Sequence, residues 1–402
     1  MSKYLEIKKI CIEHSKLSGE VIDNKLVYYA AEKENLHTEF TKSLKKHAHI
    51  TKDWPEAYLN FLMSELIAHR IFKKEGLIHK FLNHSFIKSL PTDQFEFLKK
   101  QAQHPWRFTF STIVGQPSDE FFNMEDVFTE ERYLLYSPGI AKSLMENYSE
   151  MWLLLVGFNG VCWQTFGLNI PLHSVHMDDI YFFATELDDS IELQEDISES
   201  INKNPIPFLL MLNISATPRI FHKNREIGYW FSHSDATDVS FETKKIKKYF
   251  TIEWNKGVYK LSTKDGTGME NLAVAYFDEE KKTISRYAFT EKGFRRLAKI
   301  LNSVGFDLSD EAQNHLSFNM QLFMQTFFKS EKNIDPYLEL FKKELDEDDE
   351  QLDTANEFIA AAIEIYNKKE PVDVEKIAQQ VGLDVETANE IWNSVQNTIK
   401  KL

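Results

Sequence analysis

The period of the hydrophobic residues changes from helical to strand spacing at His104-Pro105-Trp106, and this change constrains the fold more than any other feature. Before it, apolar residues recur at helical spacing, with few Gly or Pro to interrupt them. After it, every second residue of 106–110 is aromatic, which is the spacing of a strand. The sequence therefore predicts a helical N-terminal region, residues 1–104, followed by a strand-rich body.

The body, residues 105–343, contains two strand-rich regions, at about 105–186 and 205–290, with helices after them. Strand candidates occur at residues 106–110, 133–136, 152–158, 161–166, 180–185, 208–214, 227–231, 249–254, 258–261, 272–277 and 283–289. The regular alternation of strand and helix that marks a parallel sheet is missing. The pattern therefore predicts an α+β fold with antiparallel sheets and flanking helices.

Three local signals refine this prediction. Asn159-Gly160 between two strand candidates predicts a hairpin with a type I′ turn. Thr290 is a suitable cap for a helix that ends at Gly305. A long helix rich in Phe and Met is expected from about Ser309 to Ser330.

Charge and cysteine content restrict the class of partner. The chain has 402 residues and a formal net charge of −15, and a field of that sign disfavours nucleic acid as a partner. No apolar run approaches the roughly 20 residues of a membrane helix, so no membrane span is expected. Cys11 and Cys162 lie far apart in the sequence, which predicts neither a disulfide framework nor a metal-binding cysteine pair. A cytoplasmic location follows.

An acidic linker, residues 344–352, separates the body from a C-terminal segment, residues 353–402, which splits into three helices at Pro371 and Gly382. Within it, the 18 residues from Val374 to Ile391 resemble a helix-turn-helix, with Gly382 at the turn. The same pattern also resembles ubiquitin-associated three-helix modules. The first resemblance implies DNA binding and the second implies a protein partner.

Charge separates these two alternatives. The helix that would face DNA offers Asp384, Glu386, Asn389 and Glu390 in place of basic residues. From Glu344 to Leu402 there are 15 acidic and 5 basic residues, which opposes contact with phosphates. These four side chains are therefore interpreted as a surface for a protein partner.

Two polar clusters carry the types of side chain that bind metals or catalyse hydrolysis. The first contains His173, His176 and Asp178, and the second contains His233 and Asp235. If the two clusters met in space, they would form a hydrolytic zinc site. Because neither cluster has a recognisable ligand spacing, hydrogen-bonded polar loops or turns explain both better than a metal site does. We therefore expect no cofactor and no stoichiometric divalent metal.

Glu65 and His69 are a further pair, four residues apart on a predicted helix. Residues at this spacing share one face of the helix, as metal-binding or acid–base pairs often do. A hydrogen bond at the helix surface explains them as well.

Three functions are compatible with these features. The preferred one is a cytosolic protein-interaction or regulatory protein that contacts a protein partner through its C-terminal module. The second is a metal-dependent hydrolase that uses the two His/Asp clusters. The third is a DNA-binding regulator that uses the helix-turn-helix-like segment.

The acidic linker generates a testable prediction. Limited proteolysis of the whole chain should cut between Glu344 and Asp353 and release a folded C-terminal fragment, because a run of like charges cannot bury itself. Mass spectrometry of the fragments locates the cut. Cleavage elsewhere, at a protease concentration that leaves this segment intact, would show that the domain boundary is misplaced.

Overall fold

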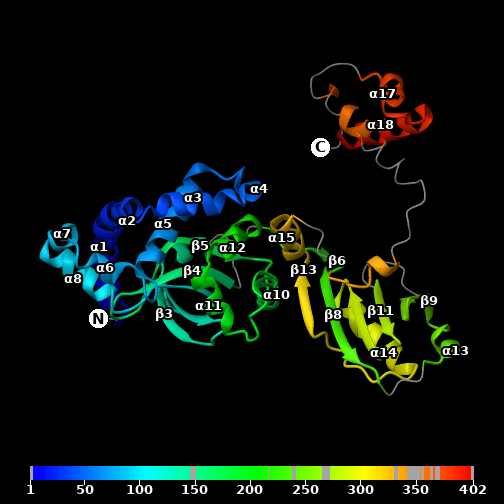
Figure 1. Ribbon diagram of the computed structural model, residues 1–402, viewed down its shortest axis with the longest axis horizontal. Coiled ribbons are helices and arrows are strands. Elements are labelled where there is room, and N and C mark those ends of the chain that lie inside the picture. The colour runs from blue at the N-terminus through cyan, green and yellow to red at the C-terminus, as the bar shows by residue number, and fades with distance from the viewer. Residues whose placement is uncertain are drawn as a thin grey trace. The chain divides into compact units, whose positions relative to one another are not determined.

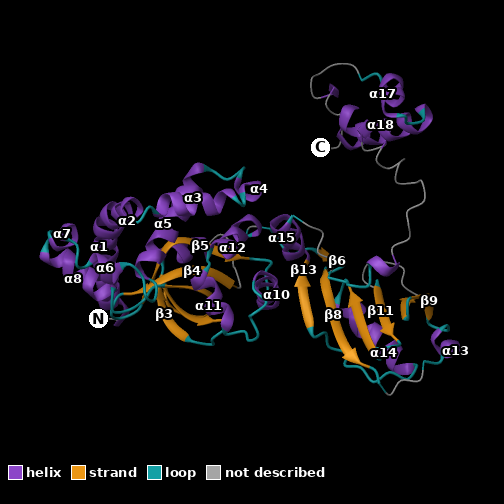
Figure 2. Cartoon of the chain, viewed as in Figure 1, coloured by secondary structure: helices purple, strands orange, loops and turns teal. Residues whose placement is uncertain are grey.

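The fold is α+β, as the sequence predicts, with helices and several β-sheets (Figures 1 and 2). The computed structural model describes residues 3–144, 151–215, 217–237, 241–264, 272–329, 334–341, 354, 357–362, 365–366 and 372–399. The chain divides into two compact units, Met1–Ile334 and Asp335–Leu402. Within the described ranges, no helix combines the length and the apolar character needed to cross a bilayer.

The N-terminal region is helical, which confirms the prediction. Its elements are α1 (Lys3–Leu17), the π-helix η1 (Ser18–Leu26), α2 (Val27–Lys33), α3 (Leu36–Lys45), α4 (Ala48–Thr51), α5 (Glu56–Phe72), α6 (Ile78–Phe81), α7 (Ser85–Lys88) and α8 (Thr92–Gln101). Helical backbone angles continue from α1 through η1 into α2, so these three elements form one uninterrupted helix. A π-helix of 9 residues is unusual, because π turns occur mostly as single bulges, frequently at functional sites.

The first strand-rich region forms a closed barrel. Its elements are β1 (Arg107–Ser118), β2 (Phe121–Asp126), β3 (Arg132–Tyr136), α9 (Pro138–Leu144), β4 (Met151–Phe158) and β5 (Trp163–Leu172). The strands follow the order β1-β2-β3-β5-β4, and every pair is antiparallel except β3 with β5. This order, with a helix between β3 and β4, is the topology of an OB-type Greek-key barrel. The antiparallel prediction is therefore wrong for one strand pair.

The predicted hairpin between β4 and β5 is confirmed, but its turn is not type I′. A type I′ turn needs positive φ at both central residues, and here only Gly160 has it (φ 98°). The side-chain oxygen of Asn159 instead accepts hydrogen bonds from the backbone of Val161 and Cys162, each at 2.9 Å. The asparagine therefore shapes this four-residue loop through its side chain.

Two strand candidates after the first region are helical, so both predictions are wrong. The elements here are α10 (Met177–Leu187), α11 (Asp196–Lys203), α12 (Ile206–Leu209) and the 3-10 helix η2 (Leu210–Ile214). Candidate 180–185 lies in α10, where Ile180, Phe183 and Ala184 are buried at helical spacing. Candidate 208–214 is an apolar run buried on several sides, and periodicity cannot distinguish a strand from a helix in such a run.

The second strand-rich region is a six-stranded antiparallel sheet in the order β13-β8-β12-β11-β10-β9. Its elements are β8 (Gly228–Asp235), α13 (Thr243–Ile246), β9 (Phe250–Asn255), β10 (Val258–Thr263), β11 (Ala273–Asp278), β12 (Thr283–Ala288), α14 (Glu291–Ser303) and β13 (Asn314–Ser317). A small hairpin of β6 (Phe221–His222) and β7 (Arg225–Glu226) precedes the sheet. Helix α14 packs against β11 and β12.

The helix predicted after β12 is confirmed. The next predicted helix, from about Ser309 to Ser330, is shorter than predicted. The Thr290 side chain accepts a hydrogen bond from Gly293 N and caps α14, as the sequence indicates. The predicted helix from Ser309 to Ser330 is wrong in its first half, because β13 extends the sheet there. Ser317 then caps α15 (Phe318–Phe328) by accepting from Met320 N.

One hydrophobic cluster joins the N-terminal helices, the barrel and the helices that follow it. Ile67 of α5, Leu155 of β4, Phe183 of α10 and Phe323 of α15 all belong to this cluster. The N-terminal helices therefore bury their apolar faces against the barrel. Figure 1 shows them beside strands β4 and β5.

The second unit has its own hydrophobic cluster, which includes Phe358, Ile377, Ala388 and Trp392. The helical elements of this second unit include η4 (Glu339–Phe341), α17 (Val374–Val381) and α18 (Val385–Ile399). Gly382 has φ 79° and ends α17 in the left-handed conformation that the sequence indicates. The predicted acidic linker, residues 344–352, lies outside the described residues.

The two cysteines meet, although they are far apart in the sequence. Their sulfur atoms are 3.4 Å apart, both thiols are buried, and the Asn159 amide donates to each sulfur. Cys11 belongs to α1 and Cys162 to the β4–β5 loop, so this contact holds α1 against the barrel.

A prediction concerns Gly157 of β4, where a Cβ atom would lie 2.5 Å from Nε1 of Trp106. Gly157→Ala should lower the free energy of unfolding by about 1–3 kcal/mol, because the indole is tightly packed and must shift. Chemical denaturation measures this change. The control is Gly19→Ala in η1, where the nearest atom to a Cβ is 3.9 Å away. Equal stability of the two variants would contradict the packing of Trp106.

Candidate functional site

The two His/Asp clusters predicted from the sequence lie in different parts of the first unit. His173 follows β5, His176 caps the start of α10, and Asp178 lies in its first turn. His233 and Asp235 are exposed on β8. His233 Nδ1 lies 2.8 Å from the Ser285 hydroxyl of β12, a contact that accounts for this ring without a metal.

Among the described residues, the one group with metal-binding geometry contains a single member of the predicted set. His176 lies near Glu226 of β7 and His315 of β13, and the three candidate ligand atoms are all within 4.8 Å of one another. His173, Asp178, His233 and Asp235 are not part of this group. Burial lowers the pKa of His315 to about 4, so that ring is neutral at pH 7.

The partner surface predicted in the C-terminal module is partly described. The Asp384 side chain accepts hydrogen bonds from Thr387 N and Oγ1. The Asn389 side chain donates to Val385 O. Both side chains therefore make contacts within the start of α18, and the side chains of Glu386 and Glu390 lie outside the described residues. The protein-partner role of this surface stays a prediction.

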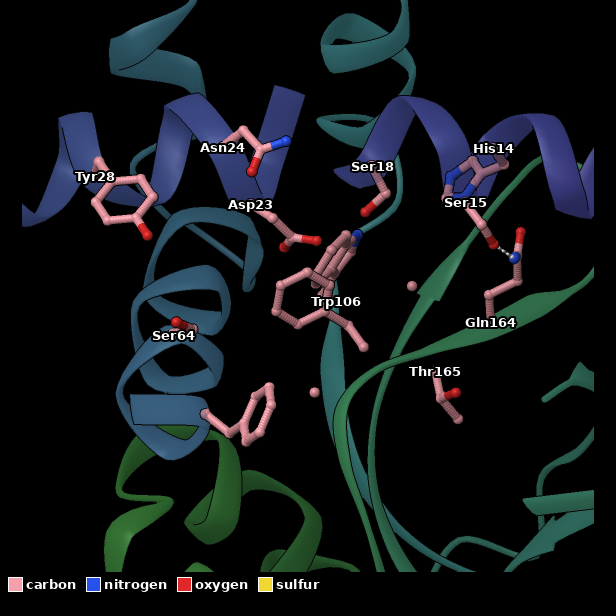
Figure 3. Close-up of a pocket in the computed structure, with 14 residues that line it drawn as sticks. His14, Ser15, Ser18, Asp23, Asn24, Tyr28, Ser64, Trp106, Gln164 and Thr165 are labelled. Carbon is pink, nitrogen blue, oxygen red and sulfur yellow. Dashed lines mark hydrogen bonds between the residues drawn. The ribbon is translucent and has the colours of Figure 1, made fainter. Parts of the chain in front are cut away.

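A polar cleft in the first unit was not among the sequence-based candidates (Figure 3). It has a volume of about 480 Å³ and lies between the continuous helix of α1, η1 and α2, helix α5, and the barrel. Its lining residues are His14, Ser15, Ser18, Asp23, Asn24, Tyr28, Phe61, Ser64, Trp106, Gly157, Gln164, Thr165, Phe166 and Gly167. Among the described residues, the lining contains neither lysine nor arginine.

The π-helix presents the ionisable group of the cleft. In η1, Val21 and Ile22 are buried, and the next two residues, Asp23 and Asn24, reach the cleft. Figure 3 shows the Asp23 carboxylate pointing toward Trp106. Asp23 is an exposed residue, and the protein atoms beside its carboxylate desolvate it enough to raise the pKa of Asp23 above its usual range. The hydrogen bonds and ion pairs found among the described residues do not involve this carboxylate.

Besides the carboxylate of Asp23, the described lining contains one imidazole, the side chain of His14. Burial lowers its pKa to about 4, against an opposing contribution from its hydrogen bond with Gln101. The two side-chain nitrogen atoms of that contact are 2.9 Å apart. At pH 7 His14 is therefore neutral, and Asp23 gives the cleft its charge.

Trp106 at the start of β1 forms the inner wall. Its Nε1 donates to Gln101 Oε1 at 3.0 Å, and its ring stacks on Phe72 with centroids 4.5 Å apart. The rings of Tyr28 and Phe61 also line the cleft, and they are 71% and 55% exposed. The inner wall is thus fixed by packing, while two aromatic rings remain open to solvent.

Glu65 lies behind the cleft, on α5. It is fully buried, and its Oε2 accepts from Leu168 N at 3.4 Å while Oε1 has no partner among the described residues. Burial raises the pKa of Glu65 well above its usual range. A Cβ atom on Gly167, which lines the cleft, would lie 2.8 Å from the Glu65 carboxyl carbon. The close approach of β5 to α5 therefore depends on this glycine.

His69, four residues after Glu65, has a different partner. Its Nε2 is 3.1 Å from Asn202 Oδ1, and burial lowers its pKa to about 3. Asn202 also exchanges two hydrogen bonds with the backbone of Phe108 in β1. Glu65 and His69 therefore connect α5 to separate parts of the barrel and its following helix, and do not act as a pair.

The cleft was missed because its lining residues come from six elements, α1, η1, α2, α5, β4 and β5, and from Trp106, and these lie far apart in the sequence. One indication of the cleft was present in the sequence: Asp23 and Asn24, a carboxylate followed by an amide, occur together within an otherwise amphipathic helix. Period 3.6 does not apply in a π-helix, so helical periodicity would place this pair on the wrong face.

Comparison of the chain with protein-family models, curated proteins and solved structures finds no match. The function must therefore be argued from the site itself.

The buried Glu65 carboxyl generates a prediction about pH. The unfolded chain releases this proton near pH 4.3, whereas the folded protein retains it to higher pH. The contribution of Glu65 to stability should therefore fall as pH rises, by about 1.4 kcal/mol per pH unit between the two pKa values. Glu65→Gln should be more stable than the natural protein at pH 8 and similar to it at pH 4.

Denaturant titrations at both pH values measure this difference. Glu56→Gln, on the exposed first turn of the same helix, is the matched control. A Glu65→Gln variant that is less stable than the natural protein at pH 8 would show that the carboxyl is ionised in the folded state.

Proposed function

We propose that this protein acts by binding: it is a regulatory protein whose cleft recognises a small organic cation. The observation that carries the proposal is the Asp23 carboxylate, which faces a cleft whose lining has no lysine or arginine. Asp23 is an exposed residue, and the protein atoms around it desolvate its carboxylate only enough to raise the pKa. An opposite charge close to this carboxylate would be attracted to it. A cationic ligand supplies that charge.

The other lining groups support the same ligand class. Anionic ligands such as phosphates or carboxylates would meet Asp23 and find no basic side chain in the lining. The neutral state of His14 at pH 7 removes the one group that would repel a cation. The formal net charge of −15 also favours the approach of cations.

The exposed rings of Tyr28 and Phe61 add a second attraction. Aromatic faces attract organic cations through the ring quadrupole, with an energy of about 0.5–2 kcal/mol per ring. Hydroxyl and amide groups of Ser18, Asn24 and Ser64 can bond a polar substituent of the ligand. A substituted ammonium ion with a hydroxyl group fits this combination.

Binding is favoured over catalysis by the hydrogen bonds of the cleft. Activation of a hydroxyl nucleophile requires a neighbouring base that accepts its proton. The Ser15 hydroxyl of the lining accepts a hydrogen bond from the Gln164 amide, and the Thr165 hydroxyl shares one with the Ser137 hydroxyl. Neither of these two described hydroxyl groups forms a hydrogen bond with His14 or Asp23. The metal-dependent hydrolase and DNA-binding alternatives gain no support from this geometry.

The test uses choline as the probe cation and its uncharged carbon analogue, 3,3-dimethyl-1-butanol, as the matched ligand. Calorimetry on the full chain should detect choline binding that is at least about tenfold tighter than binding of the alcohol, equivalent to about 1.4 kcal/mol. Asp23→Asn should remove this preference. Asp53→Asn, which changes an exposed carboxylate outside the cleft, is the control and should retain it.

The pH dependence gives an independent check, since choline is charged at every pH. Choline needs the ionised form of Asp23, whose pKa is raised. Affinity should therefore fall on acidification, starting above the usual aspartate pKa of about 3.9. Equal affinity for choline and the alcohol, or an undiminished preference in Asp23→Asn, would refute the proposed function.

A further inference from the structure

We propose that His176, Glu226 and His315 form a binding site for a divalent transition-metal ion, separate from the cation cleft. Their candidate ligand atoms, one from each side chain, all lie within 4.8 Å of one another. Two imidazoles and one carboxylate are a ligand set that zinc and related ions use, with further positions left open for water or substrate.

Three elements that are separate in the sequence supply these side chains. His176 immediately precedes α10, Glu226 ends the short strand β7, and His315 lies in β13 opposite Trp230 of β8. His176 Nε2 is 3.0 Å from Glu226 Oε1, and the rings of His176 and His315 have centroids 4.8 Å apart. A metal at this point would connect the β6–β7 hairpin to α10 and to the edge of the sheet.

A buried carboxylate fixes the framework that carries two of the ligands. Asp179 accepts hydrogen bonds from His176 N at 2.7 Å and from Ser317 N at 2.6 Å. The same side chain therefore joins the start of α10 to the end of β13. This support holds the backbone of His176 and the strand of His315 in a fixed relation before any ion binds.

The surroundings of His315 point to a ligand. Its Nε2 is buried and has no hydrogen-bond partner among the described residues, and such orphaned polar atoms are uncommon in folded proteins. The Trp230 ring lies 4.2 Å from the imidazole between centroids and restricts its motion. A Cβ atom on Gly228 would lie 2.8 Å from Nε2, so the glycine leaves this nitrogen its space.

An ion-pair network is the competing explanation of the same contacts. Arg219 Nη1 lies 3.8 Å from Glu226 Oε2, so His176 and Arg219 together can balance this carboxylate without a metal. That network makes no use of His315 Nε2. Metal binding would displace the proton between His176 and Glu226 and draw the three ligand atoms closer together.

This proposal reverses the expectation of no divalent metal that follows from the sequence. Of the five residues in the two polar clusters described there, only His176 belongs to the site. Glu226 is 50 positions away from it in the chain. No ligand spacing could have indicated the group, because strand pairing and the position of the small hairpin create it.

The test is titration of chelator-treated, full-length protein with Zn²⁺ or Co²⁺ alone. We expect one equivalent of Zn²⁺ to bind and to raise the melting temperature, since an ion that binds only the folded state stabilises it by mass action. Bound Co²⁺ should give visible absorption bands that Zn²⁺ abolishes by competition. Mg²⁺ and Ca²⁺, which prefer oxygen ligands, should produce no stabilisation at equal concentration.

Variants assign the ion to this site. His315→Ala and Glu226→Gln should each lower Zn²⁺ affinity at least about tenfold, in the range found for disturbed metal sites. His233→Ala, which removes an exposed imidazole on β8, is the control and should bind Zn²⁺ as the natural protein does. Glu226→Gln retains the side-chain shape, so it tests the ligand role even if His315→Ala fails to fold.

Failure to bind one equivalent of Zn²⁺ would overturn the proposal. So would Zn²⁺ binding that is unchanged in Glu226→Gln and in folded His315→Ala. Choline binding to the cleft does not involve these three residues, so its result is independent of this test.

Discussion

The packing of Trp106 is the interaction on which the rest of the first unit depends. Its backbone N donates to Phe72 O at the end of α5, its ring stacks on Phe72, and its indole N–H donates to Gln101 of α8. Gly157 of β4 leaves the space that the indole fills. One side chain therefore fixes where two N-terminal helices meet the barrel. The cleft lies beside this junction, and Trp106 lines it together with residues of η1.

The barrel topology predicts a particular ligand-binding face, but helix α1 packs against that face. OB-type barrels bind oligonucleotides and oligosaccharides at the face of strands 2 and 3 and at the β1–β2 and β4–β5 loops. Here Ile7 and Cys11 of α1 cover that face, in contact with Phe121, Tyr136 and Cys162. Lys8 pairs with Glu120 at the β1–β2 loop. In this barrel α1 occupies the face at which OB-type barrels bind their ligands, so topology alone is a poor guide to function.

Both proposed sites are built in the same way, at two different junctions between helices and strands. Each places charged or imidazole groups where separate elements meet. The His176, Glu226 and His315 side chains are half-buried there, whereas Asp23 is exposed at the cleft. In the cleft this leaves Asp23 without a counter-charge, and beside the sheet it leaves a nitrogen of His315 without a partner. A buried polar atom without a partner is energetically unfavourable, and a ligand that bonds to it relieves this cost. The exposed Asp23 carboxylate has no such cost, and it attracts a cation through its charge.

The sequence by itself determined the α+β class, the change from helices to strands at Trp106, the β4–β5 hairpin and the caps at Thr290 and Gly382, because each follows from local periodicity or backbone chemistry. It could not separate helix from strand in the apolar run 208–214, since burial on several sides removes the period. Only the tertiary structure brought Cys11 to Cys162, Asp23 to Trp106, and His176 to Glu226 and His315. These contacts depend on strand order and on helix packing across the barrel, and such long-range geometry leaves no spacing in the chain from which it could be read.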